Sequence, residues 1–162
     1  MDTIQQNSSK QRVDGQMTGL AGELFVAAEL LKRGLQTAIT FSNAKTIDLF
    51  AVNLKTKRNF TIQVKAVRQK TSWPISHEKI HAEHVYVFVL LNEPGQPVEY
   101  FVVPGSTLTN DPDLFRLRDY PKFPGIVHGT LKKLGFADAW HIFDEPTVDA
   151  SPALRGLPHH GR

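Results

Sequence analysis

The sequence contains no cysteine, and this absence excludes disulfide scaffolds, thiolate zinc sites, iron–sulfur clusters and cysteine nucleophiles. It also lacks a long apolar run, because the longest, residues 85–91, is far shorter than the roughly 20 residues that span a bilayer. The N-terminal segment MDTIQQNSSK holds no apolar stretch of the kind that secretory signal peptides require. We therefore expect a cytoplasmic protein that does not associate with membranes.

What the sequence does contain is typical of one globular domain. Of its 162 residues, 41% are hydrophobic and 22% are charged, so wholesale disorder is excluded. Residues 1–14 are polar, and residues 145–162 combine three prolines with small and polar side chains. Neither end has enough apolar surface to offset the entropy lost on ordering it. We expect a flexible N-terminal segment over residues 1–14, a folded domain over 15–144 and a flexible, proline-containing tail over 145–162.

A helix is predicted over residues 17–33, with Gly34 as its terminator. Apolar residues recur in this segment at three- and four-residue spacing and form an amphipathic stripe: Met17, Leu20, Ala21, Leu24, Ala28 and Leu31. Glycines inside a helix cost about 0.5–1 kcal/mol each relative to alanine. The presence of Gly19 and Gly22 therefore predicts that the helix backbone approaches a sheet closely.

Five segments predict strands, at residues 37–41, 46–53, 60–67, 85–91 and 98–103. The basic segment 54–59 predicts a hairpin connection between the second and the third of them. The fourth segment is almost continuously apolar, which is typical of a strand buried on both faces. The order of helix, three strands, crossover and two strands predicts an α/β fold with a mixed sheet of about five strands and flanking helices.

The predicted hairpin brings polar residues together on one face of the sheet. With its turn centred in segment 54–59, Asp48 lies opposite Lys65, and Phe50 lies opposite Gln63. The alternate face is apolar and predicts core: Ile47, Leu49 and Ala51 against Ile62, Val64 and Ala66. One interpretation of the polar face is an exposed ion pair between Asp48 and Lys65, which contributes at most about 1 kcal/mol. The other is a functional site, since charges flanked by apolar strands are costly.

Every charged residue between positions 54 and 70 is basic: Lys55, Lys57, Arg58, Lys65, Arg68 and Lys70. The net charge of +3, from 19 basic and 16 acidic residues, does not reveal this concentration. Such a segment is either a solvated surface hairpin or a patch that contacts phosphates. A chemical site beside it would favour the second interpretation.

Three segments carry a combination of polar residues in a fixed order: GLAGELFVAAELLKRG with Glu23, TIDLFAV with Asp48, and IQVKA with Gln63 and Lys65. In this combination the sequence resembles the PD-(D/E)XK nuclease superfamily. That superfamily has the restriction-endonuclease-like fold and includes Mrr-type restriction enzymes and archaeal Holliday-junction resolvases. The resemblance covers most of residues 17–110, and it implies an αβββαβ core.

The resemblance implies metal-dependent hydrolysis of DNA phosphodiester bonds, with Mg²⁺ or Mn²⁺ as the cofactor. It implies oxygen ligands from Asp48, the Gln63 amide, the Val64 main-chain carbonyl and Glu23, the last directly or through water. Lys65 would orient or deprotonate the attacking water and offset charge on the phosphate. The DNA backbone would be held by Lys55, Lys57, Arg58, Arg68 and Lys70.

Position 63 departs from the pattern, because much of the superfamily has a carboxylate there. The amide of Gln63 contributes no negative charge, so we expect weaker metal binding. The alternative function is therefore a catalytically inactive nuclease-like fold that binds nucleic acid or a protein partner. No separate sequence-reading domain is evident, so we expect target recognition to need a homodimer or a separate recognition subunit.

Residues 77–81 match H-E-x-x-H, the signature of zinc metalloproteases, with Glu78 as the acidic member. On a helix, His77, His81 and the later His84 would share one face. This motif makes a zinc metalloprotease a third hypothesis. The segment between Pro74 and the strand at residue 85 is too short for the long helix of such enzymes. We favour ordinary surface histidines, with a nucleic-acid contact as the next interpretation.

Overall fold

The structure is a computed structural model that describes residues 14–40, 47–115 and 124–145. Its main sheet and the preceding helix are α1 (Gly15–Lys32), β1 (Gln36–Ile39), β2 (Leu49–Asn53), β3 (Arg58–Val67), β5 (Val85–Leu90) and β6 (Glu99–Pro104). The smaller elements are β4 (Ser72–Pro74), η1 (His77–Lys79), α2 (Gly105–Asn110), η2 (Pro112–Phe115), β7 (Gly125–Val127), α3 (His128–Lys133) and η3 (Trp140–Phe143). None of the helices in these ranges is long and apolar enough to cross a membrane. Apart from Asp14 and Glu145, the two ends expected to be flexible lie outside the described residues.

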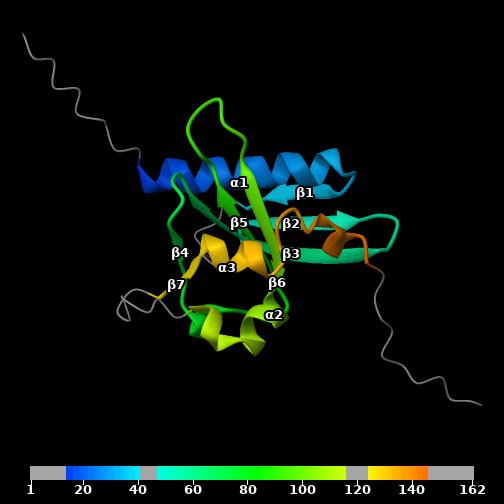
Figure 1. The fold of residues 1–162 in the computed structure, drawn as a ribbon. Coiled ribbons are helices and arrows are strands. Elements are labelled where there is room, and N and C mark those ends of the chain that lie inside the picture. Colours follow the sequence, from blue (N-terminus) through cyan, green and yellow to red (C-terminus); the bar gives the residue numbers. More distant parts are fainter. Residues whose placement is uncertain (1–13, 41–46, 116–123, 146–162) are drawn as a thin grey trace, which may run out of the picture.

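The main sheet has the strand order β1-β2-β3-β5-β6 (Figure 1). Strands β1, β2 and β3 form antiparallel pairs, β3 and β5 are parallel, and β5 and β6 are antiparallel. A parallel pair needs a crossover connection, which the segment containing β4 and η1 provides. This arrangement confirms the mixed five-stranded sheet predicted from the order of elements.

The hairpin between β2 and β3 is longer on its second strand than the sequence suggests. Strand β3 begins at Arg58 rather than at residue 60, and it pairs at once with Asn53 at the end of β2. The connection is a short turn, in which Lys57 takes a left-handed backbone conformation with φ of 59°. The turn therefore centres one residue earlier than predicted, and this changes which residues of the two strands face each other.

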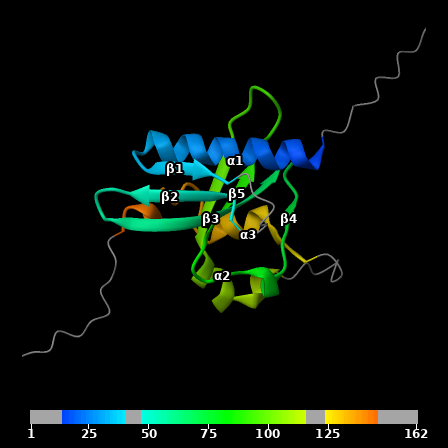
Figure 2. The ribbon, with the colours of Figure 1, turned by 180° about the vertical axis from the view of Figure 1, so that it is seen from behind.

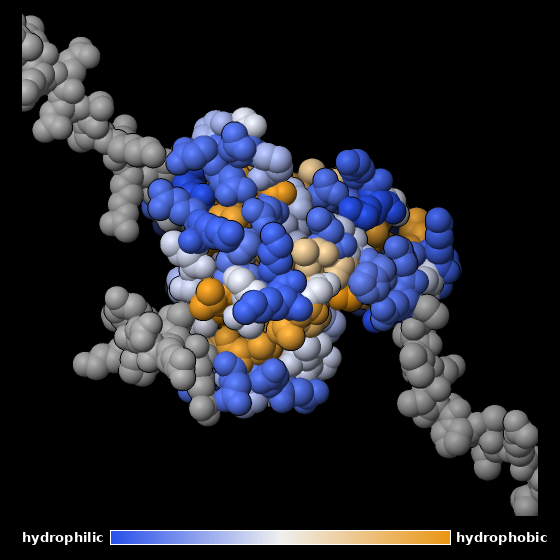
Figure 3. Space-filling view, viewed as in Figure 1, coloured by the Kyte–Doolittle hydropathy of each residue, from blue (hydrophilic) through white to orange (hydrophobic). Residues whose placement is uncertain are grey.

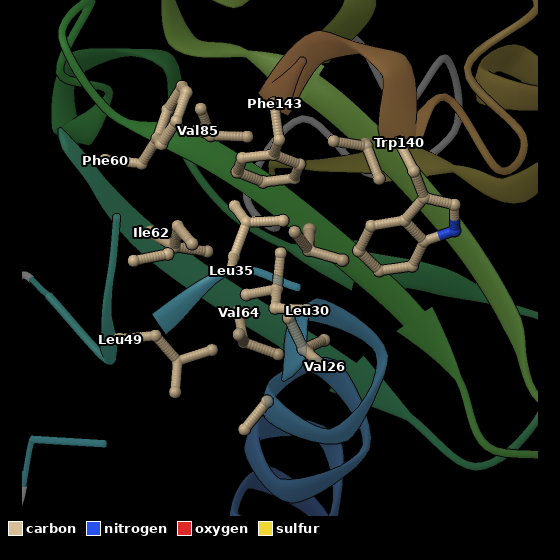
Figure 4. Close-up of a cluster of buried hydrophobic side chains, with 14 of the residues drawn as sticks. Val26, Leu30, Leu35, Leu49, Phe60, Ile62, Val64, Val85, Trp140 and Phe143 are labelled. Atoms are coloured by element: carbon tan, nitrogen blue, oxygen red, sulfur yellow. The ribbon is translucent and has the colours of Figure 1, made fainter. Parts of the chain in front are cut away.

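Two apolar layers cover the two faces of the sheet. In the first, Val26 and Leu30 of α1 pack against Leu49, Ile62 and Val64 of the sheet (Figure 4). The second layer lies on the opposite face and consists mainly of Trp73, Ile75, Tyr86, Phe88, Phe101, Leu108, Ile126 and Leu131. Strand β5 contributes alternate residues to both layers, and all six of its residues are buried. The prediction of a strand buried on both faces is confirmed.

Helix α1 packs through a different face from the predicted stripe. Its buried residues are Gly22, Val26, Ala27 and Leu30, whereas Met17, Leu20, Leu24 and Leu31 are 61, 47, 51 and 55% exposed. The predicted close approach is confirmed at Gly22, because a Cβ there would overlap the Cβ of Ala66 in β3. At Gly19 no atom lies within 4 Å of the corresponding position, so packing does not require that glycine. The helix face that carries the small residues Gly22 and Ala27, rather than the predicted leucine stripe, contacts the sheet.

The second layer is completed by β4, β7, α2 and α3, which pack against β5 and β6. Figure 2 labels β4, α2 and α3 of this layer. Both views place α1 and α2 at opposite ends of the molecule. Figure 3 shows hydrophilic residues over most of the viewed face and hydrophobic residues gathered in its lower half, between α3 and α2. The second layer does not extend over β2, since Phe50 on that face is 46% exposed. The sheet face that carries Gln63 and Lys65 is therefore partly open to solvent.

Candidate functional site

Asp48 lies at a bend just before β2, where the pairing of β2 with β3 ends, and it does not lie opposite Lys65. Leu49 pairs with Ile62 in the last pair of the two strands, and the N–H of Asp48 also bonds to the Ile62 carbonyl. The predicted opposition of Asp48 and Lys65 is wrong, because the turn centres one residue earlier than assumed. This displaces the register by two residues, which leaves the side chains of the paired residues 49–53 and 58–62 on their predicted faces. Gln63 and Lys65 therefore still share one face, and Leu49 and Ile62 still share the core face.

Hydrogen bonds hold Asp48 through its backbone and its side chain. Its N–H donates to the carbonyl of Ile62 at 2.9 Å, and its carbonyl accepts from the N–H of Thr40 at 2.9 Å. The Thr40 hydroxyl donates to the carbonyl of Ile47 at 2.6 Å and lies 3.2 Å from that of Asp48. The carboxylate Oδ2 accepts from the N–H of Val64 at 2.7 Å. The carboxylate therefore lies in the gap where β2 and β3 separate.

The same hydrogen bond orients the carbonyl of Val64. Val64 lies beyond the last pair between β2 and β3, so its N–H bonds to the Asp48 side chain instead of to a strand. A strand residue directs its N–H and its C=O toward the same neighbouring strand. We therefore expect the Val64 carbonyl to point toward Asp48, which is the orientation that a main-chain metal ligand at this position requires.

Helix α1 brings a second carboxylate to the site. Because Gly22 packs directly on Ala66 and Val64 of β3, the next residue, Glu23, is held beside the point where β2 and β3 separate. Partial burial raises the pKa of Glu23, and the negative charge of Asp48 raises it further. Burial also raises the pKa of Asp48, although the Val64 hydrogen bond and the charge of Lys65 lower it in part. The two carboxylates are therefore close enough to repel each other.

Gln63 and Lys65 approach from the other side of the sheet. Val64 and Ala66 face α1, so the alternate residues Gln63 and Lys65 point away from the helix, toward the partly open face. Both side chains are half-buried. Lys65 is close enough for its positive charge to lower the pKa of Asp48. The lysine thus lies beside the carboxylates without lying directly opposite Asp48.

The donor atoms of this site fit a hard divalent cation. Asp48 and Glu23 offer carboxylate oxygens, Gln63 an amide oxygen and Val64 a main-chain carbonyl, and Mg²⁺ and Mn²⁺ prefer such oxygen donors. Burial is the main cause of the raised pKa of both carboxyl groups, and the charge of Asp48 raises the pKa of Glu23 further. A cation between Asp48 and Glu23 would remove the repulsion between them.

The basic residues do not form one patch around this site. Lys55, Lys57 and Arg58 lie at the turn end of β3, about 20 Å from Val64 at 3.3 Å per residue. The guanidinium of Arg58 donates to the carbonyl of Glu145 at 2.6 Å and stacks over the ring of Phe60. The contiguous phosphate-binding segment suggested by the sequence is therefore divided, and Arg58 already has structural contacts.

The other end of β3 carries the remaining two predicted DNA contacts. Arg68 donates from Nε to the Thr18 hydroxyl of α1 at 3.0 Å, and Lys70 is exposed just beyond the strand. Arg68 lies about 13 Å along the strand from Val64, on the side where the carboxylates are. Four of the five predicted DNA contacts therefore face solvent or the site: Lys55, Lys57, Arg68 and Lys70.

The H-E-x-x-H segment does not form the helix that a zinc metalloprotease needs. Only His77–Lys79 is helical, as one 3₁₀ turn, and His81 lies in the loop that follows. His77 is held elsewhere, since its Nε2 lies 3.0 Å from the carbonyl of Thr109. His77 and His81 are therefore not on one helix face, and the protease hypothesis has no geometric support within the described residues.

Two candidate residues were missed by sequence reasoning, Thr40 beside Asp48 and Glu83 in the turn before β5. Thr40 bonds to the backbone of Ile47 and Asp48 across β1 and β2, and nothing in its local sequence distinguishes it. Glu83 joins His81 and His84 in a compact group, in which one ligand atom of each residue lies within 4.8 Å of the others. The signal that could have revealed this group is the sequence H-A-E-H at residues 81–84, in which successive potential ligands are one or two residues apart in a turn.

No protein-family model matches this sequence, and no curated protein matches it significantly. Several solved structures are similar in fold. The Holliday junction resolvase Hjc of Archaeoglobus fulgidus superposes with a TM-score of 0.50 at 18% identity, over 78% of this chain and 96% of its own. The bacterial homing endonuclease I-Ssp6803I gives a TM-score of 0.54 at 13% identity, over 82% of this chain and 94% of its own. The chain has the restriction-endonuclease-like fold. At these identities the likeness concerns the fold and not the chemistry.

Proposed function

We propose that this protein is a metal-dependent nuclease that hydrolyses DNA phosphodiester bonds. The observation that carries the proposal is the convergence of Glu23 and Asp48 where β2 and β3 separate. There the Val64 N–H bonds to the Asp48 carboxylate, and Lys65 lies close to Asp48. Two of the similar structures are a Holliday junction resolvase and a homing endonuclease, which is consistent with DNA as the substrate. The finer assignments, including Mg²⁺ or Mn²⁺ and the role of each residue, belong to this proposal.

Each residue has a distinct task in this proposal. Asp48 and Glu23 would hold the cation, with the Val64 carbonyl and the Gln63 amide oxygen completing the protein ligands. A divalent cation bound there would polarise the phosphodiester and lower the pKa of water. Lys65 would donate hydrogen bonds to the phosphate and offset the charge that develops on it. Thr40 and the Ile62 carbonyl would keep Asp48 in place through the hydrogen bonds to its backbone.

The direct test is cleavage of labelled single-stranded, duplex and branched DNA with Mg²⁺, with Mn²⁺ and with a chelator. We expect the full chain to cleave at least one form only when a metal is present, and Asp48→Ala to lose that activity. Glu78→Gln is the matched control, because it removes an exposed carboxylate of η1 outside the site. Equal cleavage in the presence of the chelator, or full activity of Asp48→Ala, would contradict the proposal.

The second candidate is a nuclease-like fold that binds nucleic acid or a protein partner without cutting. The observation that favours it is Gln63, which lies next to Val64 just beyond the last pair of β2 and β3 and adds no negative charge to the site. Under this alternative the protein binds DNA but cleaves none of the forms with either metal. Binding of Mn²⁺ at Asp48, measured by calorimetry on the wild type and on Asp48→Ala, would favour the enzyme over the inactive fold.

The exposed stripe of α1 is the described surface best suited to pair two copies of this chain. Met17, Leu20, Leu24 and Leu31 follow the three- and four-residue spacing of a helix-pairing seam, and they lie on the face turned away from the sheet. An antiparallel pair would bring Asp14 of one copy near Lys32 of the other. Light scattering should show a dimer that Leu20→Glu with Leu24→Glu converts to a monomer. A monomeric wild type, or a dimeric variant, would refute this arrangement.

A further inference from the structure

The turn that precedes β5 gathers two imidazoles and a carboxylate away from the Asp48 site. His81 and His84 are the first and last residues of the turn, since the N–H of His84 donates to the carbonyl of His81 at 3.2 Å. Their ring centroids are 5.1 Å apart. Nδ1 of His81 lies 3.7 Å from a carboxylate oxygen of Glu83, and one ligand atom of each of the three residues lies within 4.8 Å of the others.

We propose that His81, Glu83 and His84 bind one Zn²⁺-class transition-metal ion and leave a fourth coordination position open. Two histidines with one glutamate and an open position form a ligand set that Zn²⁺ accepts, with bonds of about 2.0–2.2 Å. The ligand atoms need to close by roughly 1 Å from their present separation to reach that geometry. His81 and Glu83 have exposed side chains and can make this adjustment, while His84 is buried and fixed.

One ring nitrogen of His84 is held by a hydrogen bond. Its Nδ1 lies 2.6 Å from the hydroxyl of Thr61 on the neighbouring strand β3. Within the described part of the chain, no hydrogen-bond partner contacts its Nε2, which leaves that nitrogen for a metal. With Nδ1 protonated, the Thr61 oxygen accepts the hydrogen bond from Nδ1–H and fixes the tautomer, as outer hydrogen bonds commonly do for ligating histidines.

The backbone of the turn is held in place from two sides. The hydroxyl of Tyr86 accepts from the N–H of His81 at 2.9 Å, and the N–H of Gly105 donates to the carbonyl of His84 at 2.7 Å. A side chain at Gly105 would collide with the carbonyls of His81 and His84, so only glycine allows α2 to start this close to the turn. These contacts fix where the three ligand side chains originate.

This site differs in chemistry from the Asp48 site. The turn offers imidazole nitrogens, which suit Zn²⁺, whereas Asp48 and its neighbours offer oxygens, which suit Mg²⁺ and Mn²⁺. Thr61 lies on the same face of β3 as Gln63 and Lys65, so both sites border one face of the sheet. The proposal does not depend on nuclease activity, and its test uses metal binding alone.

The experiment measures Zn²⁺ binding by calorimetry, and Co²⁺ binding by visible absorption, on the full chain after removal of metals with a chelator. We expect one equivalent of Zn²⁺ in the wild type and in Asp48→Ala. His81→Ala and Glu83→Gln, both at exposed side chains, should each lose that equivalent. Thr61→Val, which removes only the hydroxyl partner of His84, should weaken binding by about 10–100-fold. None of these three variants replaces the buried His84 ring, so a loss of Zn²⁺ binding cannot be attributed to disturbed packing of that ring.

Two variants serve as matched controls. His141→Ala removes an exposed histidine of η3, and Glu78→Gln removes an exposed carboxylate of η1, outside the proposed metal site. Both should bind Zn²⁺ like the wild type. The proposal is overturned if the wild type binds no Zn²⁺, if His81→Ala and Glu83→Gln retain wild-type binding, or if the Zn²⁺ equivalent is lost in Asp48→Ala instead.

Discussion

Replacing Asp48 with asparagine separates the electrostatic role of this residue from its structural role. Asparagine has nearly the same shape, and its side-chain oxygen can still accept the hydrogen bond from the Val64 N–H. The substitution removes one of two negative charges that repel each other, since the charge of Asp48 raises the pKa of Glu23. The pKa of Asp48 is raised on balance, so burial outweighs the favourable contacts of its charged form with Val64 and Lys65.

The sign of the stability change follows from the raised pKa values. A carboxyl group whose pKa is higher in the folded protein than in the unfolded chain stabilises the fold at acid pH, and this contribution is lost as pH rises through the folded pKa. In metal-free solution at neutral pH, Asp48→Asn should therefore melt at the same temperature as the wild type or higher. The difference should disappear in acid, where Asp48 and Glu23 are protonated in both states.

A bound cation should reverse the order of the two proteins. A ligand at 100 times its dissociation constant stabilises the folded state by about 2.7 kcal/mol. For a domain of this size, that free energy raises the melting temperature by about 10 °C. Mn²⁺ should produce such a shift in the wild type and in the control Glu78→Gln, and little or none in Asp48→Asn. Differential scanning calorimetry with and without a chelator measures both effects. A destabilised metal-free Asp48→Asn that keeps the wild-type Mn²⁺ shift would refute the reasoning.

Three further predictions follow from the packing and the charges. Gly22→Ala should lower the free energy of unfolding by about 1–3 kcal/mol, because its methyl group overlaps β3, whereas Gly19→Ala should raise it by about 0.5–1 kcal/mol; urea denaturation measures both. Gln63→Glu should tighten Mn²⁺ binding in calorimetry, because a second strand carboxylate then faces the cation. Lys55→Ala with Lys57→Ala should reduce the slope of log affinity for duplex DNA against log salt by about 1.8, if each lysine contacts one phosphate.

Each of these three has an outcome that contradicts it. Equal stabilities of the Gly22→Ala and Gly19→Ala variants would mean that α1 does not pack closely on β3. Unchanged Mn²⁺ affinity in Gln63→Glu would place that side chain outside the metal site. An unchanged salt slope in the double lysine variant would mean that the hairpin turn is solvated surface. For the last experiment, Lys133→Ala in α3 provides a control with a lysine on another part of the fold.

The parts of the fold that depend on local patterns could be predicted from the sequence. Gly34 ends α1 with φ of 84°, a conformation that glycine adopts without strain. The apolar run of β5 correctly indicated burial on both faces. The order of elements along the chain correctly indicated a mixed sheet of five strands, whereas Glu23, Asp48 and Lys65 of the proposed site were predicted from the resemblance to a nuclease superfamily.

The errors arose where tertiary contacts decide between local alternatives. Helix α1 is apolar on more than one side, and the contact of Gly22 with β3, rather than the leucine stripe, sets the face that is buried. The hairpin turn contains no glycine or proline to mark its centre, and it closes through Lys57 in a left-handed conformation. The bond between Thr61 and His84 joins neighbouring strands, so no local pattern could indicate it.

The most direct test of the central claim compares single-turnover cleavage by variants of the two metal-ligand motifs. In the presence of Mg²⁺, Asp48→Ala and Lys65→Ala should each slow DNA cleavage by ~10²–10³ or more, while the folded state is retained. The double variant His77→Ala with His81→Ala should cleave at close to the wild-type rate, because neither ring lies in the Asp48 site. The account would be contradicted by a fully active Asp48→Ala together with an inactive histidine pair.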